Sequence, residues 1–472
     1  YVGNPMARTP NIERLQQRGV VFDNHYCSSM PCMPARREMF TGRVNFLETP
    51  WSPLMPWDDC LQPELRRQRG TYSHLITDHY HYFHVGGENY HMPFNAWSFY
   101  RGQESDTYVS RVIPPDAPEH LGKWRAQYAQ NQTAFKKAAD YSTPKTFQGA
   151  IDWLKANEGA DNYFLWVEVF DPHEPFECPQ EYLDRYDDDW DGPLYNWSGY
   201  EVVDGQSEAT HHLQRRYAAT LTMMDEWFGK LLDEVERQNG LEDTLIILTT
   251  DHGHLLGEHN RTGKNNWHAW NEMAHIPLIV HLPGSRHAGE RRNQLTQNTD
   301  IMPTLLDFFN VPLQHPIHGE SWKGILEENT PIERAALLYG WFGRAVNLID
   351  GRYTYFRAPS DESNQPLYRY FLTPGTFSMR DVCSKEFYDG AVLGNYLSFT
   401  EYPVLRVPVN APREEEWAHT KLFDIRSDYN QKSNLVGRDI ESAYQALLVE
   451  TMKKMDAPDW QFERIGLEAD PG

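Results

Sequence analysis

Helical stretches alternate with short, almost wholly apolar runs over the first 310 residues of this 472-residue chain. Residues 146–159 are followed by YFLWVEVF (163–170), and 211–238, with apolar residues at helical spacing, is followed by TLIILTT (244–250). In a third passage the apolar run 275–284 precedes a helical stretch at 299–310. Runs that are apolar on both faces are typical of strands buried between two layers of helices. The alternation therefore predicts an α/β fold with a mostly parallel central sheet sandwiched by helices.

The N-terminal segment fits this pattern. A helix is expected after Thr9-Pro10 and before Gly19, because proline is favoured in the first turn of a helix and glycine just beyond the last. VVFDNHY (20–26) is expected to form a strand, and residues 34–42 a helix with Pro34 in its first turn.

The pattern changes near residue 335. Three segments there are expected to form an antiparallel sheet: AALLYGW (335–341), VNLIDGRYTYFRA (346–358) and HTKLFDI (419–425). Residues 439–455 are expected to form one final helix. We therefore predict a larger α/β domain over residues 1–334 and a smaller C-terminal α+β subdomain over 335–472.

Charge and composition exclude several classes of protein. The net charge of −23 argues against nucleic-acid binding, which needs a basic face. No apolar run approaches the roughly 18 residues that a membrane-spanning helix requires. The five cysteines are too few and too scattered for a disulfide framework, so at most one pair is expected to bridge.

The segment CMPARREMFTGR (32–43) carries the motif that indicates a function. It resembles the signature of type I sulfatases, within the alkaline phosphatase-like superfamily. The matching residues are Cys32, Pro34, Arg36, Phe40, Thr41, Gly42 and Arg43. In that family the cysteine is oxidised to formylglycine (3-oxoalanine), and the hydrated aldehyde attacks the sulfur atom of a sulfate ester. The resemblance therefore implies the sulfatase fold and a sulfuric ester hydrolase.

The local chemistry agrees with this interpretation. Cys32 precedes the predicted helix start, where free N–H groups favour an anion, and Arg36, one turn on, could steady the diol. Two alternatives are a buried thiol with a chance match around it and a thiol hydrolase that pairs Cys32 with a distant histidine. The match at Pro34, Arg36 and the Thr41-Gly42 pair argues against both.

Asp251, His252 and Gly253 directly follow the apolar run 244–250, and the carboxyl ends of strands are where α/β sheets bind ligands. The sulfatase family has a similar triplet, whose first two side chains bind a divalent metal. By this resemblance Asp251, His252 and the side chain at Cys32 are metal ligands. The same resemblance assigns Lys264 to a sulfate oxygen, although an ordinary solvated lysine is the alternative.

Three histidines complete the candidate site. The segment Asp171-Pro172-His173-Glu174-Pro175-Phe176 is similar to a family motif whose histidine contacts the leaving-group oxygen, so His173 is a candidate general acid. A structural loop histidine is the alternative. In YSHLITDHYHYFHVGG (72–87), His81 falls on the sulfate-binding histidine of the family, and His79 falls where lysine is usual. This departure makes the charge at position 79 depend on pH.

Sulfatases usually begin with a strand that ends in two metal-binding aspartates, and this chain begins at Tyr1-Val2-Gly3-Asn4-Pro5, just after that place. We therefore expect that the strand is missing from this sequence. A metal without those carboxylates should bind poorly, so low activity and lowered stability are expected. The family implies a divalent metal, with Ca²⁺ expected first and Mg²⁺ or Mn²⁺ as alternatives.

The function expected from the sequence is hydrolysis of sulfate esters of a carbohydrate or an aryl alcohol, in a protein of bacterial type. The expected partners are a glycan or small-molecule sulfate ester and a formylglycine-generating or anaerobic maturation enzyme. A phosphonate or phosphate monoester hydrolase of the same superfamily is one alternative, and an inactive carbohydrate-binding pseudoenzyme is another. A periplasmic or secreted location is expected, although the sequence shows no signal peptide.

Overall fold

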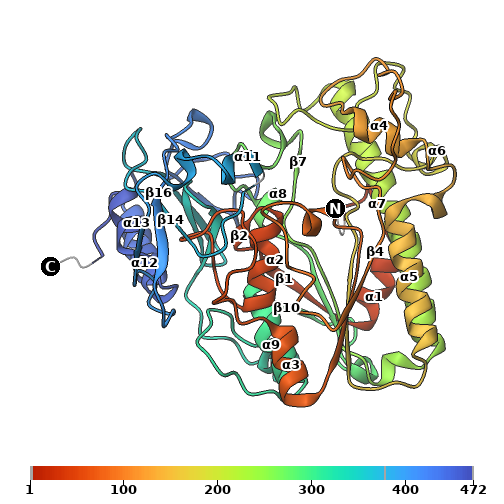
Figure 1. The fold of residues 1–472 in the computed structure, drawn as a ribbon, viewed down its shortest axis with the longest axis horizontal. Coiled ribbons are helices and arrows are strands. Elements are labelled where there is room, and N and C mark those ends of the chain that lie inside the picture. Colours follow the sequence, from red (N-terminus) through yellow and green to blue (C-terminus); the bar gives the residue numbers. More distant parts are fainter. Residues whose placement is uncertain (1–3, 377–378, 470–472) are drawn as a thin grey trace.

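The computed structural model describes residues 4–376 and 379–469. Figure 1 shows a larger part, with sheets between layers of helices, and a smaller part that contains the C-terminus. Residues 1–3, with which the given sequence begins, lie outside the described residues.

Two sheets form the centre of the larger part. The first has the spatial order β10 (Arg291–Gln297), β1 (Val20–Tyr26), β9 (Leu278–His281) and β6 (Ile246–Thr249). The second has the order β4 (Ala96–Phe99), β3 (Tyr72–Thr77) and β5 (Tyr163–Glu168). The predicted α/β class is confirmed.

Strand directions are more mixed than the sequence suggested. The β4–β3–β5 sheet is parallel throughout. In the other sheet β1 is parallel to β10, but β9 is antiparallel to both β1 and β6. An uninterrupted apolar run shows that both faces of a strand are buried, and it contains no information about direction.

Among the described strands, β5 is bonded only to β3, and β6 only to β9. All four residues of β6 are half-buried, whereas all four of β9 are buried. Each of these two strands therefore has one edge that no other described strand pairs.

Helices cover the sheets in two layers (Figure 1). One layer consists of α1 (Pro10–Arg18), α5 (Ser142–Ala156) and α7 (Glu208–Arg237). The other consists of α2 (Cys32–Thr41), α3 (Leu61–Arg69), α9 (Ile301–Phe308) and α10 (Lys323–Glu328). The longest helix, α7, begins after Ser207, whose hydroxyl accepts a hydrogen bond from the Thr210 N–H.

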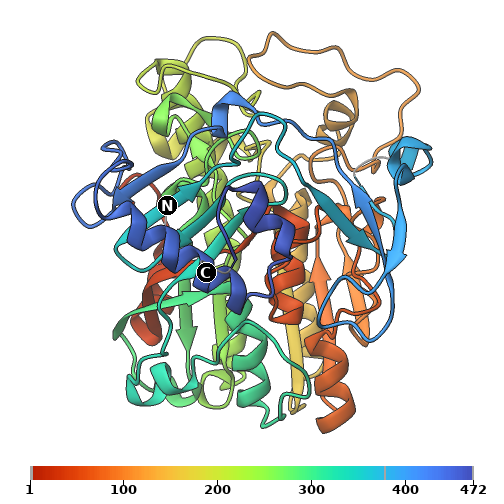
Figure 2. The same ribbon diagram turned by 90° about the vertical axis from the view of Figure 1, so that its left-hand side faces the viewer.

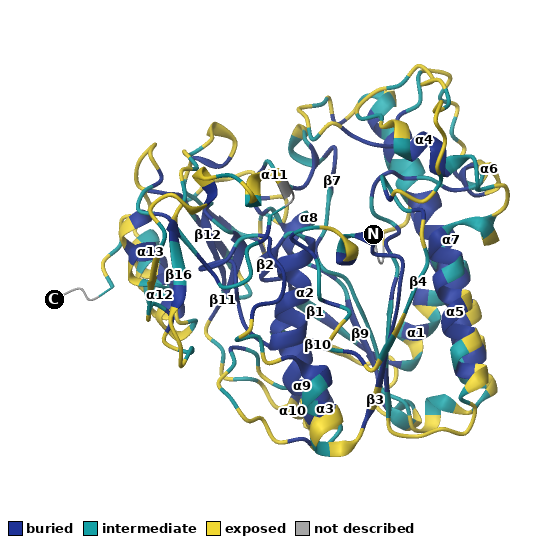
Figure 3. Ribbon diagram, in the orientation of Figure 1, coloured by how far each residue is buried: buried dark blue, intermediate teal, exposed yellow. Residues whose placement is uncertain are grey.

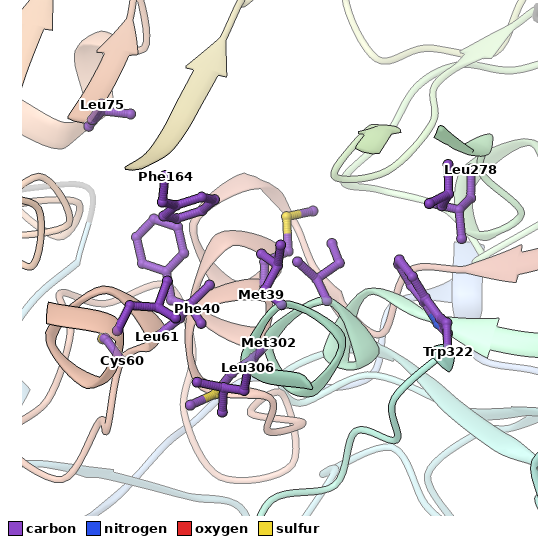
Figure 4. Close-up of a cluster of buried hydrophobic side chains, with 14 of the residues drawn as sticks. Met39, Phe40, Cys60, Leu61, Leu75, Phe164, Leu278, Met302, Leu306 and Trp322 are labelled. Atoms are coloured by element: carbon purple, nitrogen blue, oxygen red, sulfur yellow. The ribbon is translucent and has the colours of Figure 1, made fainter. Parts of the chain in front are cut away.

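Helix α2 lies in the interior of the molecule. Every one of its residues is buried, as Figure 3 shows. Its apolar side chains Met39 and Phe40 pack with Leu61 of α3 and with Met302 and Leu306 of α9 (Figure 4). This packing fixes the helix whose first residue is Cys32.

The C-terminal part contains the expected antiparallel strands. Its main sheet has the order β17 (Lys421–Asp424), β13 (Tyr353–Arg357), β12 (Val346–Ile349), β11 (Leu337–Trp341) and β2 (Ser29–Met30). A smaller sheet has the order β14 (Tyr368–Phe371), β16 (Val404–Pro408) and β15 (Val392–Gly394). Helices α12 (Glu441–Lys454) and α13 (Asp459–Arg464), blue in Figure 2, pack against the main sheet.

Strand β2 comes from the N-terminal region, yet it pairs in parallel with β11. The two parts of the chain are thus joined by a shared sheet next to Cys32. We keep the division into residues 1–334 and 335–472 as a proposal, with β2 as the strand that crosses it.

The remaining helices and strands are short. They are β7 (Leu255–Leu256), β8 (Thr262–Gly263), α4 (Ala126–Gln132), α6 (Gln180–Leu183), α8 (Asn271–Ala274) and α11 (Met379–Val382). No helix within the described ranges is long and apolar enough to cross a membrane. All five cysteines are free thiols, so no disulfide forms.

Candidate active site

Three loops and one helix end bring the predicted site residues together. Asp251 and His252 follow β6, His173 lies in the loop after β5, and Lys264 follows β8. Cys32 is the first residue of α2. Sγ of Cys32 lies 3.4 Å from Nε2 of His252 and 3.8 Å from Nζ of Lys264, and Nζ of Lys264 lies 2.5 Å from Nε2 of His173.

The thiol of Cys32 is in an environment that stabilises an anion. The helix begins at Cys32 itself, two residues earlier than predicted, so the side chain lies among the free N–H groups of the first turn. Burial alone would raise the pKa of this thiol, but the positive charges of Lys264 and His252 hold it well below its usual range. The same positive field would favour a bound sulfate.

Arg36 ties three parts of the site together. Its Nη1 donates to the carbonyl oxygen of Cys32 at 2.9 Å and to Oδ2 of Asp251 at 2.6 Å. Its Nε donates to Oε1 of Glu168 at 2.5 Å. The guanidinium therefore contacts backbone and carboxylates, and it fixes the first turn of α2 relative to the ends of β5 and β6.

Glu168 was missed by the sequence analysis. It is the last residue of β5, it is buried, and its other oxygen accepts a hydrogen bond from the Tyr82 hydroxyl at 2.6 Å. An acidic residue within a run of apolar residues was the available signal, because a buried carboxylate needs a charged or hydrogen-bonding partner.

Glu174 was also missed, although it lies inside the motif that contains His173. Its Oε2 is 3.4 Å from Nδ1 of His173, 3.5 Å from Nδ1 of His254 and 3.7 Å from Nζ of Lys264. The Tyr200 hydroxyl donates to Oε1. Burial raises the pKa of Glu174, but the charges of His173 and Lys264 bring it well below its usual range.

The pairing with Glu174 affects the candidate general acid. Burial lowers the pKa of His173, but the negative charge of Glu174 together with the hydrogen bond and charge of Cys32 outweighs this, and the pKa is raised above its usual value. The positive form of this imidazole is therefore stabilised.

The two other predicted histidines lie beside His173. The rings of His79 and His81 are centred 5.1 and 6.0 Å from that of Phe170, and the ring of Phe170 is centred 4.2 Å from that of His173. Burial, with the nearby charges of Arg36 and His173, holds the pKa of both histidines well below the usual range. Position 79 therefore offers a neutral imidazole in place of a positive lysine.

Within the described ranges, one group of side chains has the geometry to bind a metal ion. A sulfur, a nitrogen and an oxygen atom from Cys32, His252 and Asp251 lie within 4.8 Å of one another. This donor set suits a divalent metal such as Zn²⁺. Replacement of the thiol by an oxygen group would shift the preference towards harder cations. Ca²⁺ takes about six to eight oxygen ligands, which is more than these residues provide.

Comparison with known proteins identifies the family. A family model described as "Sulfatase" matches residues 1–311. The N-acetylglucosamine-6-O-sulfatase of Bacteroides thetaiotaomicron is 26% identical, with 72% of this chain and 71% of that protein covered. The multifunctional alkaline phosphatase superfamily protein PehA of Trinickia caryophylli is 22% identical over 95% of this chain and 89% of that protein.

Solved structures share the fold. The phosphonate monoester hydrolase of Agrobacterium radiobacter has a TM-score of 0.67 at 19% identity and covers 96% of this chain and 92% of its own. A structure solved with its substrate D-glucosamine-2-N,6-O-disulfate has a TM-score of 0.65 at 18% identity, with 96% and 94% covered.

The fold is thus the alkaline phosphatase-like fold that sulfatases and phosphonate monoester hydrolases share. Within it, the chain belongs to the sulfatase family, because the family model matches well over half of its length. It is a sulfuric ester hydrolase.

Proposed function

We propose that this protein hydrolyses the sulfate ester of a glycan or an aryl alcohol, with formylglycine formed at Cys32 and a divalent metal bound by Asp251, His252 and residue 32. The observation that carries the proposal is the convergence of Cys32, His252, Lys264 and His173 within hydrogen-bonding reach of one another. Ca²⁺ is the metal proposed first, and water and the bound sulfate would have to supply the oxygen ligands that these three residues do not; Mg²⁺ and Mn²⁺ are the alternatives.

Lys264 provides the charge that binds the sulfate group. Its ammonium group is buried next to residue 32, and a buried positive charge is a strong partner for an anion because little water screens it. Burial lowers the pKa of Lys264, but the charges of Cys32 and Glu174 raise it above its usual value. In the formylglycine form the Cys32 charge is absent, and Glu174 is the buried carboxylate that keeps Lys264 positive.

His173 supplies the proton for the leaving alcohol. Glu174 stabilises the imidazolium from the Nδ1 side, so Nε2, which faces the Lys264 ammonium at 2.5 Å in this structure, would carry the proton once a bound sulfate ester separates the two groups. Nε2 faces Lys264 and is on the same side as Cys32, so a sulfate ester bound by Lys264 would place its bridging oxygen near this proton.

Formylglycine at position 32 would supply a nucleophilic hydroxyl and a second hydroxyl for release of the sulfate, and the metal would neutralise charge on the sulfate oxygens. The position suits a small polar group, since it is enclosed by His252 and Lys264 at a helix N-terminus. We propose that a formylglycine-generating or anaerobic maturation enzyme makes this group, and that the protein acts in the periplasm or outside the cell.

A phosphonate monoester hydrolase is the second candidate. The structural similarity to such an enzyme favours it. Parallel assays with 4-nitrophenyl sulfate and 4-nitrophenyl phenylphosphonate test the choice. We expect a larger kcat/KM for the sulfate, and a larger value for the phosphonate would reverse our assignment.

The nucleophile is tested by the intact mass of the peptide that contains Cys32, from protein made in a host with a maturation system. Formylglycine differs from cysteine by loss of H₂S and gain of one oxygen atom. We expect this mass change at Cys32 and not at the exposed Cys383. We also expect Cys32→Ala to lose turnover and Cys383→Ala to keep it. Unmodified Cys32 in fully active protein would contradict the proposal.

A further inference from the structure

A pocket of about 280 Å³ lies outside the residues described so far. One wall is the segment 259–270, which includes β8 and follows the metal-ligand loop. The other wall is the segment 415–421, which leads into β17 of the C-terminal sheet. The side chains on which the argument depends are Arg261, Trp267, His268, Trp270, His419 and Lys421.

Two indole rings form the apolar surface of this pocket, and both are held in place. Nε1 of Trp267 donates to the carbonyl oxygen of Thr262 at 2.8 Å. The ring of Trp270 stacks on that of His259, with centroids 4.1 Å apart. Trp267 is almost fully buried, so the partly exposed Trp270 offers the larger contact area, at a low cost in conformational entropy.

Two positive charges lie over these rings. The guanidinium of Arg261 is 4.9 Å from the centroid of the Trp267 ring, and Nζ of Lys421 is 5.8 Å from that of Trp270. The hydrogen bonds of Arg261 go to backbone carbonyls, and neither cation forms an ion pair with any carboxylate in the described part of the chain. The two glutamates of the pocket, Glu415 and Glu416, are exposed, and Glu415 is hydrogen-bonded to His419 at 2.9 Å.

His268 adds a polar group that has no partner. The residue is buried, and its Nδ1 has no hydrogen-bond partner among the described residues. A buried, unpaired polar atom costs free energy. Burial also lowers the pKa of His268 to about 3, so the ring is neutral and can donate to or accept from a hydroxyl group. Nδ1 has almost no accessible surface, so a ligand in the pocket does not reach it without a rotation of the ring.

The chain connects this pocket directly to the candidate active site. Arg261 and Lys264 are three residues apart, on either side of β8. Three residues of fully extended chain cover at most about 11 Å. The backbone at Arg261 therefore lies within about 11 Å of that at Lys264, a span that a second sugar ring attached to the reacting one can cover.

We propose that this pocket binds a second sugar ring of a glycan substrate, and that Arg261 and Lys421 recognise an acidic substituent on it, a sulfate or a carboxylate. The partly exposed ring of Trp270 suits the sugar ring, and the cations Arg261 and Lys421, which form no ion pair with a described carboxylate, suit the acidic group. This inference takes one point from the proposed function, namely that the substrate is a sulfated glycan.

Binding is tested without turnover in the Cys32→Ala protein. Sulfated tetrasaccharides derived from heparin, chondroitin sulfate and carrageenan are titrated by calorimetry. We expect at least one to bind, and Lys421→Gln to weaken it about tenfold, as loss of one hydrogen bond to a charged group does. Lys421→Arg should retain most of the affinity. Lys323→Gln, the same change at an exposed position on α10, is the matched control.

A second experiment measures kcat/KM in protein that keeps Cys32. It compares the tetrasaccharide that binds most tightly with 4-nitrophenyl sulfate, which is too short to reach the pocket. Lys421→Gln should lower the ratio of the two kcat/KM values about tenfold. Equal affinity of Lys421→Gln and the parent, or no binding by any tetrasaccharide, would overturn the proposal. If the protein showed no sulfatase turnover but Lys421→Gln still weakened tetrasaccharide binding, the proposed function would be wrong and the proposed binding pocket would stand.

Discussion

Oε2 of Glu174 lies 3.7 Å from Nζ of Lys264, and both side chains are almost fully buried. This carboxylate also contacts His173, His254 and Tyr200. It therefore orients the two side chains to which we assign sulfate binding and proton transfer, although it contacts neither Cys32 nor the proposed metal ligands in the structure.

Substitution of Glu174 should impair catalysis through its neighbours. In Glu174→Gln the charge that raises the pKa of His173 is lost, so the imidazole should lose its proton at lower pH. We expect kcat to fall about 10- to 100-fold, as for other groups that orient site residues, and the basic limb of the pH–rate profile to move to lower pH. Glu177→Gln, three residues away and bonded to Tyr128 and Asn196, is the control. An unchanged profile in Glu174→Gln would contradict this role.

Substitution of His173 should depend on the leaving group. A general acid matters most when the leaving alcohol is a poor one, because a good leaving group needs little protonation. His173→Gln should therefore lower kcat about 100-fold or more for an alkyl or sugar sulfate, and much less for 4-nitrophenyl sulfate. His120→Gln, at a half-buried histidine outside the site, is the comparison. Equal losses on both substrates would show that His173 only shapes the site.

Removal of metal should abolish activity. We expect dialysis against a chelator to eliminate turnover of 4-nitrophenyl sulfate, and stoichiometric Ca²⁺, Mg²⁺ or Mn²⁺ to restore it. Asp251→Asn should lower metal affinity about 10- to 100-fold, measured by metal analysis after equilibrium dialysis. Full activity in protein free of metal by that analysis would exclude the proposed metal site.

Stability should decrease in mild acid because of buried neutral histidines. His25 on β1 is fully buried and hydrogen-bonded to Thr296 and Asn298, and burial lowers its pKa to about 4. Below the unfolded pKa of about 6.5 the unfolded chain therefore takes up a proton that the folded chain does not, and stability falls as the pH drops from about 7 towards 4.

This single group should lower the free energy of unfolding by about 1 kcal/mol between pH 7.5 and 5.5, measured by urea denaturation. His25→Gln should be less stable overall but show a smaller pH dependence. A pH dependence identical to that of the parent protein would mean that His25 does not contribute.

Packing around α2 should control stability. Phe40 is fully buried, and its ring meets that of Trp166 edge-on at 5.1 Å. Phe40→Ala should destabilise the protein by about 3–5 kcal/mol, seen as a lower urea midpoint. Phe308→Ala, at a partly exposed phenylalanine on α9, should cost much less. A loss below 1 kcal/mol for Phe40→Ala would show that the neighbouring side chains close the cavity.

Local patterns predicted most elements but not their pairing. The helices α1, α7 and α12 and the strands β1, β6 and β11 lie where apolar spacing places them, because burial of one face or two faces leaves a periodic mark in the sequence. The antiparallel course of β9 and the pairing of β2 with β11 left no such mark, because pairing depends on partners far away in the chain.

The sequence by itself determined the family and the α/β class, and it supplied the candidate side chains of the site, because the signature around Cys32 and the motifs around His173 and Asp251 are local. Only the tertiary structure decided how these groups act on one another. Glu174 and Glu168 acquired roles through contacts with Lys264 and Arg36, which lie 90 and 132 positions away in the chain. Burial set the charges of the histidines, and both burial and distance arise only when the chain is folded.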